Sequence, residues 1–152
     1  MDDFYKRLVK RDIEKYYNYK ESLSSINCQI KELEERKINA GVANYKLSEG
    51  RGSGSSGAFS KEELAIINTN AKIDMLKTNR DDAIDHIKRL ERAMECLNFK
   101  EKDILISIYG DRSRRNNKLE ILTEKYHYEK SHLYRIANGC IEKISYKLYG
   151  KA

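Results

Sequence analysis

Two long stretches of heptad-spaced apolar residues constrain the fold of this 152-residue chain more than any other feature. In the first stretch, two sets of side chains recur every seventh residue: Tyr16, Leu23 and Ile30 in one row, and Tyr19, Ile26 and Leu33 in the other. Such an a/d pattern is typical of a helix that buries one seam against another helix. With the apolar residues Phe4, Leu8 and Val9 ahead of it, the pattern predicts a helix from about residue 3 to residue 37.

The second stretch predicts a helix over residues 60–98. Ser60 and Glu63 have the spacing of a capping box, in which each side chain satisfies a free backbone N–H at the helix start. Downstream, two heptad rows follow, with Arg80 interrupting the first: Ile66, Ile73, Ile87 and Met94, and then Leu76, Ala83, Leu90 and Leu97.

Two helices of similar length predict an antiparallel helical hairpin over residues 1–98. The glycine-rich segment 47–59 is expected to be the loop between them, because its composition is that of a flexible linker. It lacks the G-K-[ST] sequence and the preceding strand of a phosphate loop. An intermolecular coiled coil that buries the same seams remains the alternative, and it would make the protein a homo-oligomer.

Residues 99–152 carry most of the net charge of +6. They contain 12 lysines and arginines against 7 acidic residues, whereas residues 1–98 contain 18 against 17. A small basic module is the electrostatic footprint of a protein that binds a polyanion, although a solubilising surface would also be basic.

The apolar pattern of this module predicts three helices. Asn98 and Glu101 form a second capping pattern, and Gly110 is a natural stop. A short helix follows, with Leu119, Leu122 and Tyr126 on one face, and His127 and Tyr128 form a tight turn. The last helix is expected to begin near Glu129 and to face five residues inwards: Leu133, Ile136, Cys140, Ile144 and Leu148.

A short helix, a tight turn and a longer helix follow the order of a helix-turn-helix, whose second helix enters the DNA major groove. The candidate DNA-binding residues at the start of that helix are Lys130, Ser131, His132, Tyr134 and Arg135. Ser131, Tyr134 and Arg135 share one face, although packing of Tyr134 against the preceding helix is an open alternative. The candidate phosphate contacts are Arg112, Arg114, Arg115 and Lys118.

Residues 97–150 resemble region four of bacterial sigma factors. That region has an L-x-x-x-E-x-x-I-L-x-x-x-Y helix, matched here by Leu97, Glu101, Ile104, Leu105 and Tyr109, and then an E-I-A-x-x-L helix, matched by Glu120, Ile121, Leu122 and Tyr126. The ending LYRIANGCIEKISYKLYG is similar to that of the ArpU/RinA-type regulators of phage late genes, at Leu133, Tyr134, Arg135, Ile141, Lys143, Ile144, Leu148, Tyr149 and Gly150.

The resemblance implies an all-α, sequence-specific transcription regulator that activates phage or prophage late genes. Its partner would be double-stranded promoter DNA, and contact with host RNA polymerase is left open. Two features depart from the pattern: the basic loop 111–117 is longer than usual, and His127 replaces the glycine often found in the turn.

Other classes are less well supported by the sequence. We expect no enzyme, cofactor or metal site, because the three histidines lack metal spacing and the three cysteines lack C-x-x-C spacing. The acidic start and the lack of a long apolar run predict neither a signal peptide nor a membrane span. The odd number of widely spaced cysteines argues against disulfides and favours a reducing cytoplasm. A phage DNA-packaging protein, such as a small terminase subunit, is the main alternative, because it also joins a basic module to oligomerising helices.

Overall fold

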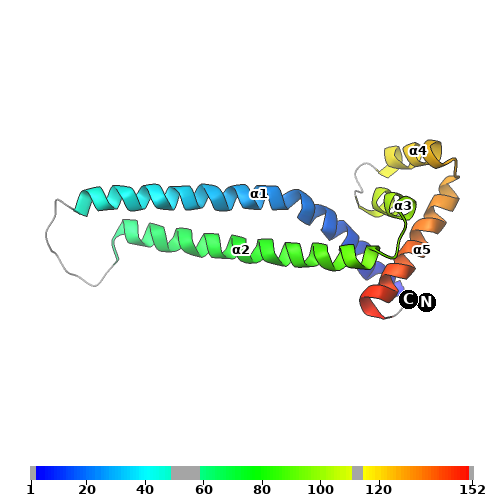
Figure 1. Cartoon of the computed structure of the whole chain (residues 1–152), viewed down its shortest axis with the longest axis horizontal. Coiled ribbons are helices and arrows are strands. Elements are labelled where there is room, and N and C mark those ends of the chain that lie inside the picture. Colours follow the sequence, from blue (N-terminus) through cyan, green and yellow to red (C-terminus); the bar gives the residue numbers. More distant parts are fainter. Residues whose placement is uncertain (1–2, 49–58, 111–114, 151–152) are drawn as a thin grey trace. The chain divides into compact units, whose positions relative to one another are not determined.

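The structure is a computed structural model that describes residues 3–48, 59–110 and 115–150, with side chains described at 4–40, 59–110 and 117–150. Within these ranges every regular element is an α-helix, which confirms the expected all-α class. The helices in chain order are α1 (Asp3–Ser48), α2 (Lys61–Met94), α3 (Phe99–Tyr109), α4 (Arg115–Tyr126) and α5 (Lys130–Tyr149) (Figure 1). No helix in the described ranges has a stretch long and apolar enough to span a membrane.

Helix α1 continues well past its expected end at residue 37 and stops at Ser48. The segment 38–48 contains no proline, and a single interior glycine such as Gly41 costs a helix only about 1 kcal/mol relative to alanine. Leu47 and Ser48, which were expected to begin the glycine-rich loop, therefore belong to the helix. The rest of the predicted loop, residues 49–58, lies outside the described residues.

Helix α2 begins as expected but ends four residues early. The Ser60 backbone N–H donates to Glu63 Oε2 at 2.8 Å, and the Glu63 N–H donates to Ser60 Oγ at 3.2 Å, so the predicted capping box is confirmed. After Met94 the backbone turns through bonds to the third preceding residue, including Leu97 N–H to Met94 O at 3.0 Å. Asn98 then takes an extended conformation as the N-cap of α3, and this conformation ends α2 before residue 98.

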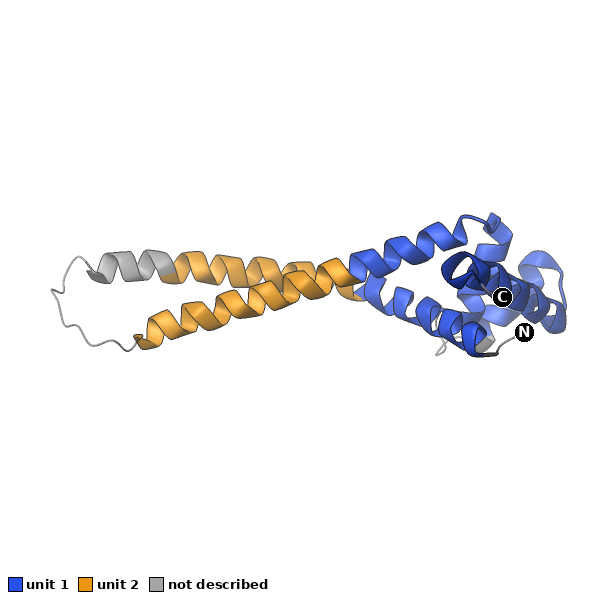
Figure 2. Ribbon diagram, turned by 90° about the horizontal axis from the view of Figure 1, so that it is seen from below, with its two compact units in different colours: residues 1–21, 83–152 blue, residues 22–82 orange. Residues whose placement is uncertain are grey.

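The chain divides into two compact units, coloured separately in Figure 2. Unit 1 comprises residues 1–21 and 83–152, and unit 2 comprises residues 22–82. The expected boundary between residues 98 and 99 falls inside unit 1, because the first turns of α1 and the last turns of α2 belong with α3, α4 and α5.

Unit 2 is held by the seam that the heptads predict. Ile30, Ile73 and Leu76 are buried in one cluster, against which Ile26 and Leu33 pack. At its edge, Lys77 Nζ lies 2.8 Å from Glu34 Oε1. The hydrogen bond from Lys77 lowers the pKa of the Glu34 carboxyl below its ordinary value.

Unit 1 has the larger core, and α1 contributes to it through Val9 and Ile13, which are fully buried. Polar contacts join the same part of α1 to α5. Lys6 Nζ lies 3.1 Å from Glu142 Oε1, and the Tyr149 hydroxyl donates to Asp12 Oδ2 at 2.6 Å. Burial and this hydrogen bond to Asp12 raise the pKa of Tyr149 to about 12.

Candidate nucleic-acid interface

The connection between α4 and α5 is three residues long, from His127 to Glu129. His127 has φ 55°, which is the left-handed conformation that a glycine would adopt without strain. For a residue with a side chain this conformation costs roughly 1–2 kcal/mol. Glu129 is the N-cap of α5, with φ −69° and ψ 151°, and it makes no side-chain capping bond. The backbone N–H groups at the start of α5 therefore receive no side-chain oxygen from the N-cap residue.

One apolar cluster fixes α3, α4 and α5 to one another. Ile104 and Ile108 come from α3, and the cluster is completed by Leu119 and Leu122 from α4 and by Leu133 and Ala137 from α5. Because all three helices contribute to it, the position of the exposed face of α5 is determined by this cluster.

The inward face of α5 lies slightly to one side of the expected one. Leu133, Cys140 and Ile144 are buried as expected, whereas Ile136 and Leu148 are only half-buried. Three buried residues were not expected to face inwards: Ala137, Ile141 and Ser145. Together with Leu133 they recur every fourth residue, a helical spacing from which their burial could have been predicted.

Aromatic and basic side chains brace the turn against α3. Lys100 Nζ lies 2.6 Å from the Tyr128 hydroxyl and 4.1 Å from the centre of its ring. Tyr128 in turn meets the ring of His132 edge-on, with centroids 4.6 Å apart. The first turn of α5 is thus tied through Tyr128 to α3.

Asp103 ties the end of α4 to α3 in the same way. Its Oδ2 accepts hydrogen bonds from Lys125 Nζ at 2.7 Å and from the Tyr126 hydroxyl at 2.6 Å. Burial alone would raise the pKa of Asp103, but these two bonds outweigh it and the pKa lies below its ordinary value. The hydrogen bond to Asp103, together with the neighbouring Tyr126 hydroxyl, raises the pKa of Lys125.

A third connection between helices runs from the start of α3 to α5. Asn98 and Glu101 form a reciprocal capping box, as the sequence predicts, and Lys143 Nζ lies 2.6 Å from Glu101 Oε1. Behind this pair the Cys140 thiol is buried, and burial raises its pKa to about 11. Cys140 is therefore a protonated core residue at neutral pH rather than a reactive thiolate.

The candidate residues on α5 divide into two groups. Lys130, Ser131 and Arg135 are exposed, and Ser131 and Arg135 are four residues apart on one face. His132 is half-buried against Tyr128, and Tyr134 is half-buried and packs on the cluster of α3, α4 and α5. This position of Tyr134, on a cluster that includes Leu119 and Leu122 of α4, fits the alternative of packing against the preceding helix.

Asn138 is exposed on the same side of α5, three residues after Arg135, and it was not among the predicted residues. The Tyr109 hydroxyl donates to its Oδ1 at 2.9 Å, which fixes the orientation of the amide. Extending the spacing of Ser131 and Arg135 by one turn would have identified Asn138. We refer to Ser131, Arg135 and Asn138 as the outer face of α5.

The predicted phosphate contacts are only partly visible. Lys118 is half-buried, and its Nζ lies 5.7 Å from the centre of the Tyr17 ring. Arg112 and Arg114 lie outside the described residues, and Arg115 begins α4 with its side chain outside the described set. A role in neutralising phosphates thus stays a prediction for all four.

Comparisons with known proteins identify no relative: no protein-family model matches the chain, and no curated protein or solved structure matches it significantly.

Proposed function

We propose that the protein is a sequence-specific DNA-binding transcription regulator. The observation that carries this proposal is the outer face of α5, where Ser131, Arg135 and Asn138 are exposed along the first half of the helix. Arg can contact both acceptors of guanine in the major groove, Asn can pair with adenine, and Ser can contact either kind of base. The basic charge of residues 99–152 would add attraction to phosphates that does not depend on sequence.

In this proposal α4 and α5 form a helix-turn-helix similar to sigma factor region four, with α5 as the recognition helix. The short connection, the left-handed His127 and the cluster shared with α3 support this interpretation. Helices α1 and α2 form an antiparallel hairpin, which is supported by the contacts between them within each unit, such as Glu34 with Lys77 and Tyr16 with Glu91.

The resemblance of residues 97–150 to ArpU/RinA-type regulators supports activation of phage or prophage late genes. The partner is then double-stranded promoter DNA in the cytoplasm, and host RNA polymerase is a candidate second partner. No enzymatic step and no cofactor is part of this proposal.

The proposal is tested by selection from a random duplex library with the purified full-length chain. Sequencing of the retained DNA should give one enriched motif, and footprinting should show protection over that motif. Retention of DNA without any enriched motif would rule out sequence-specific regulation.

A small terminase subunit, or a similar DNA-packaging protein, is the second candidate. The observation in its favour is an apolar stripe on α2, in which Leu64, Ile67 and Met75 are 46%, 45% and 54% exposed and share one helical face. A stripe of this kind can pack against neighbouring copies. Light scattering of the purified protein distinguishes the two functions through its molar mass. A packaging protein should form a ring of several copies, whereas the regulator should be a monomer or dimer.

A further inference from the structure

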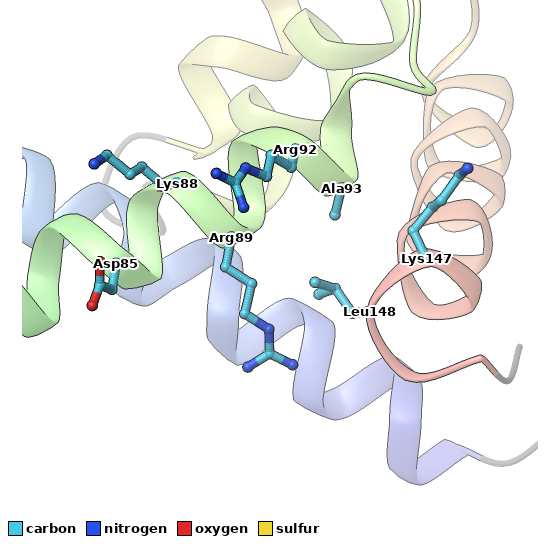
Figure 3. A pocket seen from close by; sticks show the side chains of 7 residues that line it. All are labelled: Asp85, Lys88, Arg89, Arg92, Ala93, Lys147 and Leu148. Atoms are coloured by element: carbon cyan, nitrogen blue, oxygen red, sulfur yellow. The ribbon is translucent and has the colours of Figure 1, made fainter.

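A basic hollow of about 540 Å³ lies in unit 1, away from the outer face of α5 (Figure 3). The last turns of α2 and the end of α5 line it. Four lining side chains are cationic: Lys88, Arg89, Arg92 and Lys147. Asp85 is the one acidic residue among the described residues of the lining, and Ala93 and Leu148 face each other between the two helices (Figure 3).

The four cations outnumber the acidic side chains that surround them in the described residues. None of them forms an ion pair in the described part of the chain, although Asp85 lies among them and Asp12 lines a smaller cavity together with Arg89. Two further acidic residues of α2 and α5 are paired with α1 instead. Glu91 Oε1 lies 3.3 Å from Lys20 Nζ and accepts a hydrogen bond from Tyr16, and Glu142 is paired with Lys6. Arg89 lies over the ring of Tyr149, at 5.5 Å from its centre. With four cations against Asp85, the hollow keeps an excess of positive charge that favours an anionic ligand.

The shape and the floor of the hollow indicate what kind of anion it fits. The phosphates of a DNA duplex lie on its outer surface, and the phosphate backbone has no apolar group that would pack against the apolar residues of the hollow. A volume of this size is that of a small ligand site, which combines apolar walls with a few placed polar groups. Ala93 and Leu148 supply the apolar part, and guanidinium groups such as those of Arg89 and Arg92 match carboxylates in two-bond geometry.

We propose that this hollow binds an acidic segment of a partner protein, in which an apolar side chain is flanked by aspartate or glutamate. The apolar side chain would lie between Ala93 and Leu148, and the carboxylates would meet the four cations. Lys147 follows Arg135 by 12 residues in α5, which is roughly 18 Å along the helix axis. The hollow would therefore stay accessible while the start of α5 is bound to DNA. This inference goes beyond the proposed function and does not depend on it.

The test is fluorescence polarisation with the full chain, without DNA, and with labelled ten-residue peptides. The first peptide has leucines flanked by Asp and Glu, the second has Lys at the acidic positions, and the third has Ser in place of the leucines. We expect binding of the first peptide in the micromolar range, at least tenfold weaker binding of the third, and none of the second. The Lys88→Glu/Arg92→Glu variant should weaken binding of the first peptide at least tenfold.

The matched control is Lys61→Glu/Lys72→Glu, which makes the same change in net charge on exposed side chains of α2 outside the hollow. Its affinity should stay within twofold of the original, and thermal melts should show that both variants are folded. The proposal is wrong if no acidic peptide binds, if the third peptide binds as well as the first, or if both variants lose affinity equally. It is also wrong if the hollow variant loses affinity for random duplex DNA while its peptide binding is unchanged. Failure of the chain to bind any DNA would contradict the proposed function and leave this result intact.

Discussion

Replacement of Arg135 with alanine should weaken binding to the selected DNA site far more than binding to unrelated DNA. The Arg135 side chain is exposed and lies four residues from Ser131 on the outer face of α5. Since an exposed side chain contributes little to folding, we expect the free energy of unfolding to change by less than about 0.5 kcal/mol. Loss of a guanine contact should cost about 1–3 kcal/mol, which corresponds to a rise in Kd of roughly 5- to 150-fold.

Fluorescence polarisation against the selected site and a scrambled duplex, each at three salt concentrations, measures this difference. The variant should lose its sequence preference at one base pair of the site. The dependence of affinity on salt concentration should stay the same if Arg135 contacts no phosphate. Arg36→Ala is the matched control, because it removes the same charged side chain from an exposed position of α1 in unit 2. An equal loss for both duplexes would make Arg135 a phosphate contact. No loss in a folded variant would refute the assignment of this face as the one that reads bases.

Three further predictions concern the folding of the protein itself. Asn98→Ala removes the side-chain oxygen that accepts from the Glu101 N–H at 2.8 Å, and urea titration should show a loss of about 1 kcal/mol; an unchanged midpoint would mean that the cap is dispensable. Gly110→Ala would place a Cβ 2.6 Å from the Ile106 carbonyl oxygen and 2.8 Å from the Tyr17 ring. As in an overpacked core, we expect the free energy of unfolding to fall by about 1–3 kcal/mol and the melting temperature to fall with it. A rise in melting temperature would show that the Tyr17 ring moves aside easily. Glu101 and Asp103 both have lowered pKa values in the folded protein, so their stabilisation is present above the ordinary carboxyl range near about pH 4 and is lost as the pH falls through the folded pKa values. The free energy of unfolding, measured at pH 6 and pH 3, should be lower at pH 3, and the difference should be smaller for the Glu101→Gln variant. An equal difference in that variant would contradict the role of Glu101.

Heptad spacing and capping residues predicted the helices better at their starts than at their ends. Ser60 and Asn98 begin α2 and α3 because each has a glutamate three residues later that completes a capping box. The end of α1 had no comparable signal, since neither a proline nor a clear C-cap stands near residue 37, and the helix runs on to Ser48. The early end of α2 follows from the extended conformation that Asn98 needs, a constraint set by the next helix.

Burial within α5 could be predicted only approximately. Heptad-like spacing identified Leu133, Cys140 and Ile144. It missed Ala137, which is buried because residues of α3 and α4 pack with it in one cluster, and it missed Ile141, which is also fully buried. A small residue such as Ala137 gives little hydrophobic signal in a sequence, although it permits close approach of the helices.

The candidate site was harder to predict, because exposure depends on contacts with residues distant in sequence. Tyr134 and His132 have the chemistry of DNA-binding side chains, yet the module core and Tyr128 partly cover them. The contact between Lys118 and Tyr17 spans 101 positions in the sequence, and no local pattern indicates it. The basic hollow was missed for the same reason, since its cations come from two helices that are separated by α3 and α4.

The two proposed binding surfaces share one helix, α5, which carries the outer face and contributes Lys147 and Leu148 to the hollow. The buried side of α5 runs from Leu133 to Ser145, and the exposed start of the helix and the lysine at its end belong to this one helix. Helix α5 has 20 residues and is roughly 30 Å long. A ligand bound at one end therefore leaves the other end accessible, and the core need not rearrange for both ligands to bind. The side chains fit this division: in the proposed function Ser131 and Asn138 would form hydrogen bonds to base edges, whereas Lys147 adds charge to the hollow. A protein built in this way could hold DNA with the start of α5 and an acidic partner with its end, which is the arrangement that a transcription regulator needs to bring a second protein to a promoter.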